Sequence, residues 1–197
     1  MAGKESNFLN MTLTLLVVTL VASAALGYVY QITKAPIAKA KLEKKIKAIS
    51  EVTHDFDNNP VNEALKFAVD TDSLEMYPAK MGGKITSYAI RTISHKGYSG
   101  DIVIMVGFDT QGKIINTAVV EHKETPGLGS KMSEAKFSNQ FIDLDPESST
   151  VKVTKDKGEI DAITAATISS RAFCDAVNKA HEIFKRELNN GSEKELQ

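Results

Sequence analysis

The chain of 197 residues is long enough for one domain with a sizeable core and a short additional segment, but too short for two full domains. Its 24 Lys and Arg residues and 25 Asp and Glu residues give a formal net charge of -1, which argues against a nucleic-acid-binding protein because such proteins need a concentrated basic surface. The single cysteine, Cys174, excludes an internal disulfide and a cysteine-built zinc or iron–sulfur site, so any redox chemistry must have another source.

The N-terminal segment is uncharged from Ser6 to Thr33, and its apolar run from Phe8 to Tyr30 is long enough to cross about 30 Å of hydrocarbon as a helix. The small residues 22–24 are also typical of a signal-peptide cleavage site, which makes a removed signal peptide the competing interpretation. The apolar run continues past these residues, and it lacks the polar face of a helix on a soluble core. We therefore predict a short flank and a transmembrane anchor in residues 1–33.

Residues 34–60 are expected to form an amphipathic stalk helix and a linker. Leu42, Ile46 and Ile49 recur at helical spacing within 38–52, with lysines on the opposite face. The lysines after the span would, by a positive-inside count, keep the following domain in the cytoplasm. This rule is weaker when a long folded domain follows, so the charge pattern alone leaves the orientation open.

Residues 61–188 have the pattern of one domain. A short helix is expected at 62–67. Three strands are expected at 84–94, 101–108 and 113–121, where β-branched and aromatic residues are frequent, and their short connections predict an antiparallel sheet. Helices at 133–141 and 169–188, a strand at 151–154 and a frayed polar tail at 189–197 complete the prediction. The expected fold class is α+β: a single N-terminal transmembrane helix followed by one domain with an antiparallel sheet flanked by helices.

The stretch from Glu124 to Gly129, with the sequence ETPGLG, directly follows the third predicted strand. Two glycines and a proline in six residues make a loop whose backbone can approach a flat ligand closely, because glycine has no side chain. A plain strand-to-helix connection has the same composition, and it is the simpler interpretation of this stretch alone.

A second stretch, residues 161–171, concentrates four hydroxyl side chains and an arginine at the start of the last predicted helix. Free backbone N–H groups and the helix dipole favour an anion such as a phosphate at such a place. The alternative is structural, because Ser169 or Ser170 can cap the helix while Thr164 and Thr167 bond nearby backbone groups. For this stretch alone, capping is the better interpretation.

Together, the two motifs resemble the FMN-binding domain shared by the G subunit of the Rnf electron-transport complex and the C subunit of the sodium-translocating NADH:quinone reductase. The resemblance covers nearly the whole chain: the N-terminal span, the strand-rich middle, the loop 124–129 and a flavinylation motif followed by a helix. In that family the motif reads Asp, two variable residues, Ser or Thr, Gly, Ala, and Ser or Thr, and the last hydroxyl carries FMN through a phosphoester. That position is Thr167 here, and Ala165 stands where glycine is usual.

The resemblance implies FMN as a covalent cofactor on Thr167, with neither a catalytic residue nor a metal ligand in the chain. The phosphate would lie near the start of the last helix, with the loop 124–129 against the isoalloxazine ring. Tyr98, in a turn before the second strand, could cover a face of the ring. The implied cofactor-binding residues are Thr167, Thr164, Ala165, Ala166, Ser169, Glu124, Thr125, Gly127, Leu128, Gly129 and Lys131.

The resemblance also implies a function: a membrane-anchored electron-transfer subunit of a complex that couples ferredoxin and NAD electron transfer to ion translocation, without activity of its own. The compact length favours the Rnf protein; the alternatives are the C subunit of the quinone reductase and a stand-alone membrane-anchored FMN-binding protein. A threonine hydroxyl with no adjacent histidine is a poor nucleophile, so a separate flavin transferase must attach the FMN.

The family's transferase acts outside the cytoplasm. We therefore expect the main domain on the periplasmic side of the inner membrane, held by a single span. The expected partners are the other subunits of the complex and the flavin transferase, and no nucleic acid.

Overall fold

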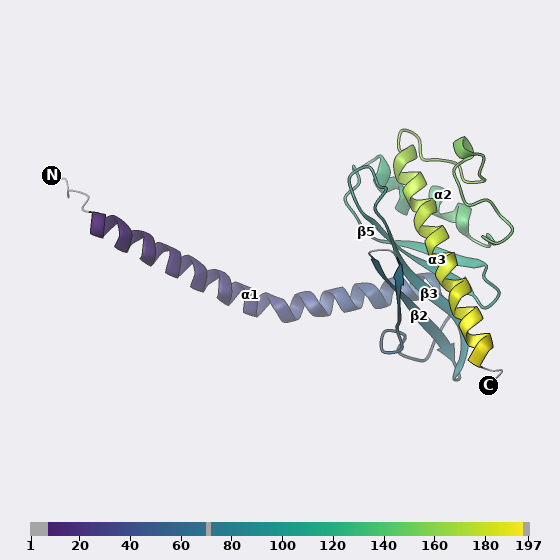
Figure 1. The fold of residues 1–197 in the computed structure, drawn as a ribbon, viewed down its shortest axis with the longest axis horizontal. Helices are drawn as coiled ribbons and strands as arrows, with labels where there is room; N and C mark the ends of the chain where they lie inside the picture. Colours follow the sequence, from purple (N-terminus) through teal and green to yellow (C-terminus); the bar gives the residue numbers. More distant parts are fainter. Residues whose placement is uncertain (1–7, 70–71, 195–197) are drawn as a thin grey trace. The chain divides into compact units, whose positions relative to one another are not determined.

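The computed structural model of the chain describes residues 8–69 and 72–194, and it divides into two compact units after Glu43. Most of helix α1, Phe8–Val52, forms the first unit (Figure 1). The side chains of residues 8–32 are exposed, and this part of the helix is long and apolar enough to cross a membrane. Length and composition therefore indicate a membrane span, although a signal sequence has the same two properties.

The threonine hydroxyl groups in the apolar part of α1 are hydrogen-bonded within the helix. Those of Thr12, Thr14 and Thr19 donate to backbone carbonyls four residues earlier, at 2.9, 2.7 and 2.9 Å. Thr33 donates to the carbonyl of Val29 in the same way, at 2.8 Å. Hydrocarbon offers a hydroxyl no partner, so these internal bonds reduce the cost of placing threonines in a membrane.

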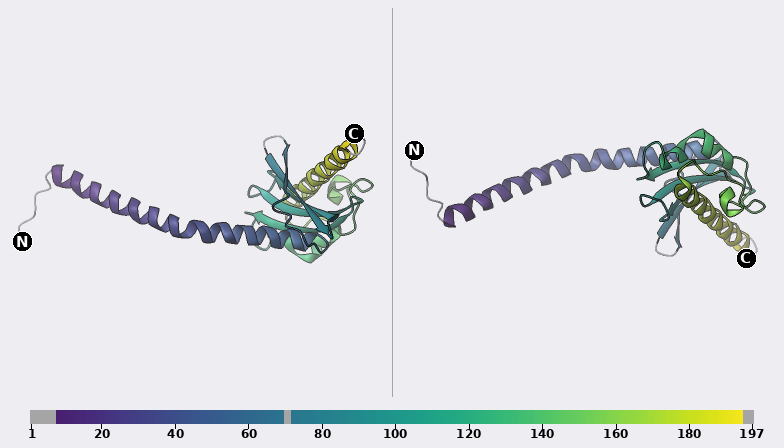
Figure 2. Two further views of the ribbon diagram at one scale, coloured as in Figure 1. Left: turned by 90° about the horizontal axis from the view of Figure 1, so that it is seen from below. Right: turned by 90° about the horizontal axis from the view of Figure 1, so that it is seen from above.

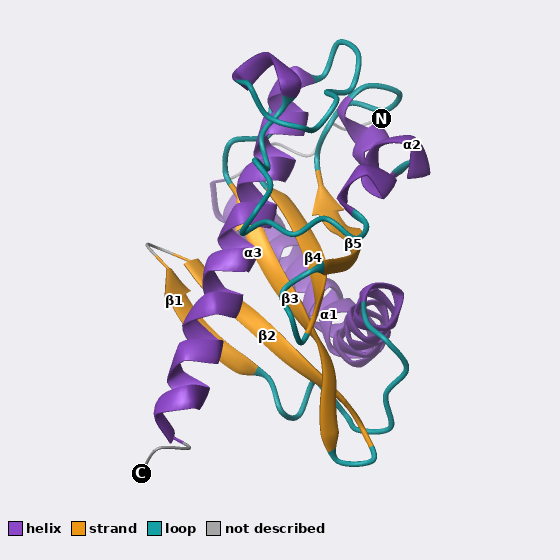
Figure 3. Ribbon diagram, turned by 90° about the vertical axis from the view of Figure 1, so that its right-hand side faces the viewer, coloured by secondary structure: helices purple, strands orange, loops and turns teal. Residues whose placement is uncertain are grey.

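The second unit is built on a five-stranded antiparallel sheet with the strand order β1-β2-β3-β4-β5 (Figure 3). The strands are Leu65–Val69, Asp72–Met81, Lys84–Ser94, Ile102–Asp109 and Ile114–His122. The three strands predicted in the middle of the chain are confirmed as β3, β4 and β5, and each pairs with its neighbour in sequence. The α+β fold class is confirmed as well.

The helix predicted at 62–67 is wrong, because this part of the chain is a turn that leads into β1. β1 and β2 form a hairpin that the residue pattern does not predict. One reason is Pro78, which lies within β2 opposite Tyr88 of β3. A proline has no backbone N–H to donate to a sheet, so its presence argues against a strand when the sequence is read alone.

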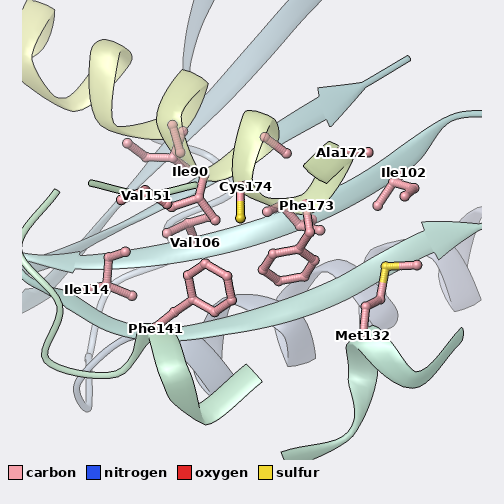
Figure 4. Close-up of a cluster of buried hydrophobic side chains, with 14 of the residues drawn as sticks. Ile90, Ile102, Val106, Ile114, Met132, Phe141, Val151, Ala172, Phe173 and Cys174 are labelled. Atoms are coloured by element: carbon pink, nitrogen blue, oxygen red, sulfur yellow. The ribbon is translucent and has the colours of Figure 1, made fainter. Parts of the chain in front are cut away.

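Helix α3, Thr167–Lys194, packs across one face of the sheet (Figures 2 and 3). The rings of Phe108 on β4 and Phe184 on α3 stack with their centroids 5.2 Å apart. Closer to the start of α3, Phe173 lies 5.0 Å from Phe141, between centroids, in the main core (Figure 4). The helix predicted at 169–188 is confirmed and runs on to Lys194; the rest of the predicted tail, 195–197, lies outside the described residues.

The other face of the sheet is covered by the last turns of α1. Ala48, Ile49 and Val52 are buried there in a small second core. Two stalk lysines also bind the domain: Lys44 Nζ donates to the carbonyl of Val120 at 2.5 Å, and Lys45 forms an ion pair with Glu75 at 3.1 Å. These two lysines therefore have partners within the folded domain.

The chain between β5 and α3 is mostly irregular. The helix predicted at 133–141 is present as α2, Ala135–Ser138, between the 3-10 turns η1, Gly129–Ser133, and η2, Asn139–Phe141. The strand predicted at 151–154 is wrong, because Val153 makes one isolated bridge to Ile160 and the chain then turns as η3, Thr154–Asp156. This turn brings a basic loop to the start of α3.

Candidate functional site

The two motifs selected from the sequence line one pocket, which we call the motif pocket. It lies between the loop after β5, the turn between β3 and β4, and the start of α3, and its volume is about 480 Å³. It is lined by Tyr98, Glu124, Thr125, Leu128, Gly129, Ala165, Ala166, Thr167, Ile168 and Ser169. Small-molecule sites usually have volumes of about 300–1,000 Å³, so the size fits a ligand.

Glu124 joins the three walls of the motif pocket. Its side chain is buried, with 5% of its surface exposed. One carboxylate oxygen accepts the backbone N–H of Ser99 at 2.9 Å, and the other accepts the hydroxyl of Ser169 at 2.7 Å. The carboxylate therefore ties the β3–β4 turn and helix α3 to the loop that carries it.

The loop 124–129 is a compact turn with an exposed tip. The carbonyl of Thr125 accepts the N–H groups of Leu128 and Ser130 at 3.1 and 3.3 Å. Gly127 has φ 76, in the left-handed region, and its N–H donates to the hydroxyl of Ser130 at 2.9 Å. The turn holds Leu128 half-exposed at the pocket, while Gly127 is in the tip and does not line the pocket.

Neither serine caps helix α3, so the capping interpretation is not what the structure shows. Ala166 accepts the first helical hydrogen bond, from the N–H of Ser170 at 3.1 Å, and an alanine side chain has no oxygen for capping. The hydroxyl of Ser170 instead accepts the N–H of Ile163 at 3.0 Å, and the hydroxyl of Ser169 donates to Glu124. Within the described part of the chain, the N–H groups of 167–169 have no acceptor.

Ala165 lies in the left-handed region, with φ 60. An L-residue with a Cβ is strained there, whereas glycine is not. The turn before α3 therefore gives a physical reason for a glycine at this position. Alanine keeps the same turn at some cost in conformational energy.

Thr167 is the first residue of α3 and is half-buried. Its hydroxyl accepts a hydrogen bond from Lys155 Nζ at 3.2 Å. Lys155 was not among the residues selected from the sequence; the only signal for it is the concentration of lysines in 152–157. Arg171, the arginine of the second motif, binds Asp156 through two hydrogen bonds of 2.7 Å.

Two of the selected residues lie elsewhere. Thr164 and Lys131 line a neighbouring pocket of about 310 Å³, together with Gln140 and Asp161. The Gln140 side chain holds this region by bonding both the N–H and the carbonyl of Asp161, at 2.7 and 3.2 Å. The structure thus separates Thr164 and Lys131 from the motif pocket.

Two other residues have structural roles. His122 Nδ1 accepts the backbone N–H of Glu124 at 3.1 Å at the end of β5. Cys174 is buried in the core, and this burial raises the pKa of its thiol to about 12, so it stays protonated at neutral pH. Across residues 8–69 and 72–194, no three His, Cys, Asp or Glu side chains are grouped so as to hold a metal ion.

Comparison with known proteins agrees with this geometry. A family model described as FMN-binding domain matches residues 97–182, which contain the whole motif pocket. The G subunit of the ion-translocating oxidoreductase complex of Vibrio cholerae is 31% identical over 182 residues, covering 86% of this chain and 87% of the relative. The chain belongs to this G-subunit family. The equivalent protein of Pseudomonas aeruginosa is 32% identical over 196 residues, covering 93% and 91% of the two chains.

Among solved structures, the crystal structure of NqrC from Shewanella oneidensis aligns with a TM-score of 0.47 and 16% identity, covering 73% of each chain. The family assignment rests on the G-subunit relatives, whose similarity extends over both units. The resemblance stated from the two motifs is thereby confirmed. This member of the G-subunit family carries an FMN-binding domain, and its apolar helix together with the name of its relatives indicates a single-pass membrane protein.

Proposed function

We propose that this chain is an electron-transfer subunit of a membrane-bound complex and that it carries FMN joined through its phosphate to Thr167. The observation that carries the proposal is the convergence of the two motifs on one pocket, where the Thr167 hydroxyl lies at an uncapped helix start. Of the eleven residues implied by the resemblance, eight line this pocket. Gly127, Thr164 and Lys131 lie outside it and have a weaker claim to contact FMN.

The residues present fit both ends of FMN. Uncapped N–H groups and the positive end of the helix dipole favour a phosphate at Thr167. Tyr98, Leu128 and Ile168 keep 71%, 42% and 47% of their surface exposed and line the same pocket, which supplies apolar contacts for a flat ring. Glu124, Thr125 and the backbone of Gly129 supply polar and close-approach contacts.

When bound, FMN supplies the electron chemistry, and the protein holds the cofactor and shields it. We propose a relay with no substrate site of its own. Attachment requires an outside enzyme, because the Thr167 hydroxyl accepts a hydrogen bond from Lys155 and no base bonds to it among the described residues. A flavin transferase would replace the diphosphate P–O bond of FAD by a bond from Thr167 Oγ1 to phosphorus. AMP would leave, and the hydroxyl proton would pass to the transferase.

The proposed setting is a complex that couples electron transfer between ferredoxin and NAD to ion translocation. Residues 1–33 would anchor the chain in the inner membrane, with the flavin domain on the periplasmic side where the transferase acts. The lysine pattern of the stalk favours the cytoplasm by count, but Lys44 and Lys45 have partners in the domain. The sodium-translocating quinone reductase and a stand-alone FMN-binding protein remain the alternative settings.

The decisive test is intact-mass analysis of the chain from its native host, with peptide fragmentation to locate the added group. We expect the mass of one FMN less one water, on Thr167, and no flavin release in denaturant. Thr167→Val should abolish the added mass, whereas Thr164→Val should keep it. Release of flavin from denatured wild-type chain, or retention by Thr167→Val, would show that the covalent assignment is wrong.

Sidedness can be tested separately, because the only cysteine is buried. A Lys152→Cys variant places one exposed thiol on the flavin domain. A membrane-impermeant maleimide should label it in cells with a permeabilised outer membrane and an intact inner membrane. Labelling that requires lysis of the inner membrane would place the domain in the cytoplasm instead.

A further inference from the structure

A lysine from outside both motifs contacts the hydroxyl on which the proposed function depends. Lys155, in the turn η3, donates from Nζ to Thr167 Oγ1 at 3.2 Å. The two residues are twelve positions apart and belong to different elements, so their contact is a consequence of the fold.

An ion pair fastens the loop of Lys155 to α3. Arg171 Nε and Nη2 donate to the two carboxylate oxygens of Asp156, each at 2.7 Å. These hydrogen bonds hold the pKa of the Asp156 carboxyl below its usual range. Asp156 is next to Lys155 in sequence, and Arg171 is one helical turn after Thr167, so this pair fixes where Lys155 meets the helix.

Lys155 interacts electrostatically with the neighbouring Asp156 carboxylate but does not form an ion pair with it. Throughout the part of the chain that the structure describes, no acidic group lies within ion-pair distance of its ammonium nitrogen, and Asp156 is occupied by Arg171. An ammonium group has three donors, and the one contact found here is to a neutral hydroxyl. A phosphate on Thr167 Oγ1 would bring anionic oxygens to this cation.

We propose that Lys155, which contacts Thr167 of the motif pocket without lining the pocket itself, is a phosphate-binding residue: its ammonium group binds the anionic phosphate oxygens of FMN and positions the phosphate at Thr167. The identity of the ligand rests on the proposed function. Of the two cations in and near the motifs, Arg171 is paired with Asp156, and no contact between Lys131 and Thr167 is found among the described residues. Asp156 and Arg171 act as positioning residues for Lys155.

The test compares FMN with riboflavin, which differs from it by the phosphate. The full chain, made in a host without a flavin transferase and purified in detergent, is titrated with each flavin while flavin fluorescence is followed. A charge-assisted contact should make wild-type chain bind FMN about tenfold or more tightly than riboflavin. The ratio of the two dissociation constants reports the phosphate contact and cancels general damage to the pocket.

Lys155→Gln should lower this ratio several-fold and leave the part that the N–H groups and dipole of α3 contribute, while Lys155→Arg should keep most of the ratio because the charge remains. Lys152→Gln is the matched control, since it removes the same charge from an exposed lysine of the same loop that lines a different pocket, and it should keep the wild-type ratio. The proposal would be overturned if Lys155→Gln and Lys152→Gln lowered the ratio of dissociation constants equally. It would also be overturned if Lys155→Gln and Lys155→Arg lowered this ratio equally. A wild-type chain that binds FMN no better than riboflavin, including one that binds neither, would overturn it as well.

Failure of this inference differs from failure of the proposed function. Suppose the native host yields an FMN ester on Thr167, but the ratio of the riboflavin and FMN dissociation constants does not change in Lys155→Gln. Then the proposed role of Lys155 is wrong and the proposed function stands. Suppose instead that this ratio falls in Lys155→Gln, but no ester is found on Thr167. Then the covalent attachment is wrong, and Lys155 is still a phosphate-binding residue.

Discussion

The hydroxyl of Ser169 donates to a carboxylate oxygen of Glu124 at 2.7 Å, with both side chains almost fully buried. This bond joins the first turn of α3 to the loop after β5, and so joins the two motifs at the motif pocket. The second oxygen of Glu124 accepts the N–H of Ser99, which adds the turn that carries Tyr98. The Glu124 carboxylate therefore connects all three walls of the motif pocket: the loop after β5, the β3–β4 turn and the start of α3.

Ser169→Ala should destabilise the domain. It removes one of the two donors found for a buried carboxylate, and a buried polar group left without its partner costs about 1–3 kcal/mol. The measurement is urea unfolding of the full chain in detergent, followed by tyrosine fluorescence. The control is Ser138→Ala, because among the described residues that exposed hydroxyl bonds to the carbonyl of Glu134, which directly precedes α2. Equal unfolding midpoints for both variants would contradict this role of Ser169.

The two glycines of the ETPGLG loop should respond differently to alanine. A Cβ on Gly129 would lie 2.5 Å from Glu124 Oε2 and 2.6 Å from Ser169 Oγ, so Gly129→Ala must push the Glu124–Ser169 contact apart. A Cβ on Gly127 would meet open space, although its φ of 76 makes alanine strained. We expect a loss of about 1–3 kcal/mol for Gly129→Ala from overpacking and about 1–2 kcal/mol for Gly127→Ala from strain.

Flavin content separates these two glycines more sharply than stability does. In chains from the native host, Gly129→Ala should lower the bound FMN per chain, because it distorts the motif pocket, whereas Gly127→Ala should keep it near the wild-type value. Intact-mass analysis measures the bound FMN per chain in both variants. Equal flavin content in the two variants would show that the close approach at Gly129 is not needed for the site.

Where the sequence pattern was regular, it predicted the fold well. The strands β3 to β5 have many β-branched residues and short turns, and the stripe of Phe173, Val177 and Phe184 predicts the buried face of α3. β1 and β2 were missed because Pro78 interrupts the strand pattern and because β1 is short. β1 pairs with β2, and β2 pairs with β3 across the short turn of Gly82 and Gly83, so both strands are held by their neighbours in sequence.

The site was predictable in part. Thr167 and Leu128, which the family resemblance selected and their local composition did not, line the same pocket, and their contact with FMN stays a prediction. Lys155 and the pairing of Arg171 with Asp156 could not be inferred, because they depend on how an irregular loop folds back on α3. Thr164 lines the other pocket although the next residue, Ala165, lines the motif pocket, and the local sequence does not indicate this difference.

His95 should make stability depend on pH. Its Nδ1 lies 2.7 Å from Asp101 and its Nε2 lies 3.0 Å from Asp72, and these hydrogen bonds, with Asp101 the larger cause, raise the pKa of the imidazole. A raised folded-state pKa stabilises the protein fully below the unfolded value of about 6.5, and this contribution is lost as the pH rises through the folded-state value. The contribution of His95 to the free energy of unfolding should therefore fall as the pH rises from about 6.5 through the higher folded-state value, while His181, whose pKa burial lowers, contributes in the opposite direction.

The control variants for this pH dependence are two histidine substitutions. His95→Gln should remove the fall between these pH values, and His54→Gln should leave it unchanged, because the exposed His54 ring has no acidic partner among the residues described. Urea unfolding at a series of pH values measures both. If the free energy of unfolding of His95→Gln has the wild-type dependence on pH, the hydrogen bonds of His95 to Asp72 and Asp101 do not contribute to that dependence.

Ala165→Gly should stabilise the chain, against the usual effect of introducing glycine. Ala165 has φ 60, and relief of this strain contributes about 1–2 kcal/mol, while the added freedom of the unfolded chain costs about 0.4–1 kcal/mol. The net gain should be about 0.5–1 kcal/mol in urea unfolding. Ala166→Gly is the matched control; this buried residue is not in the left-handed region, so glycine there should destabilise. If both variants destabilise equally, the turn before α3 is not strained, and the departure from the usual glycine at 165 has no energetic consequence.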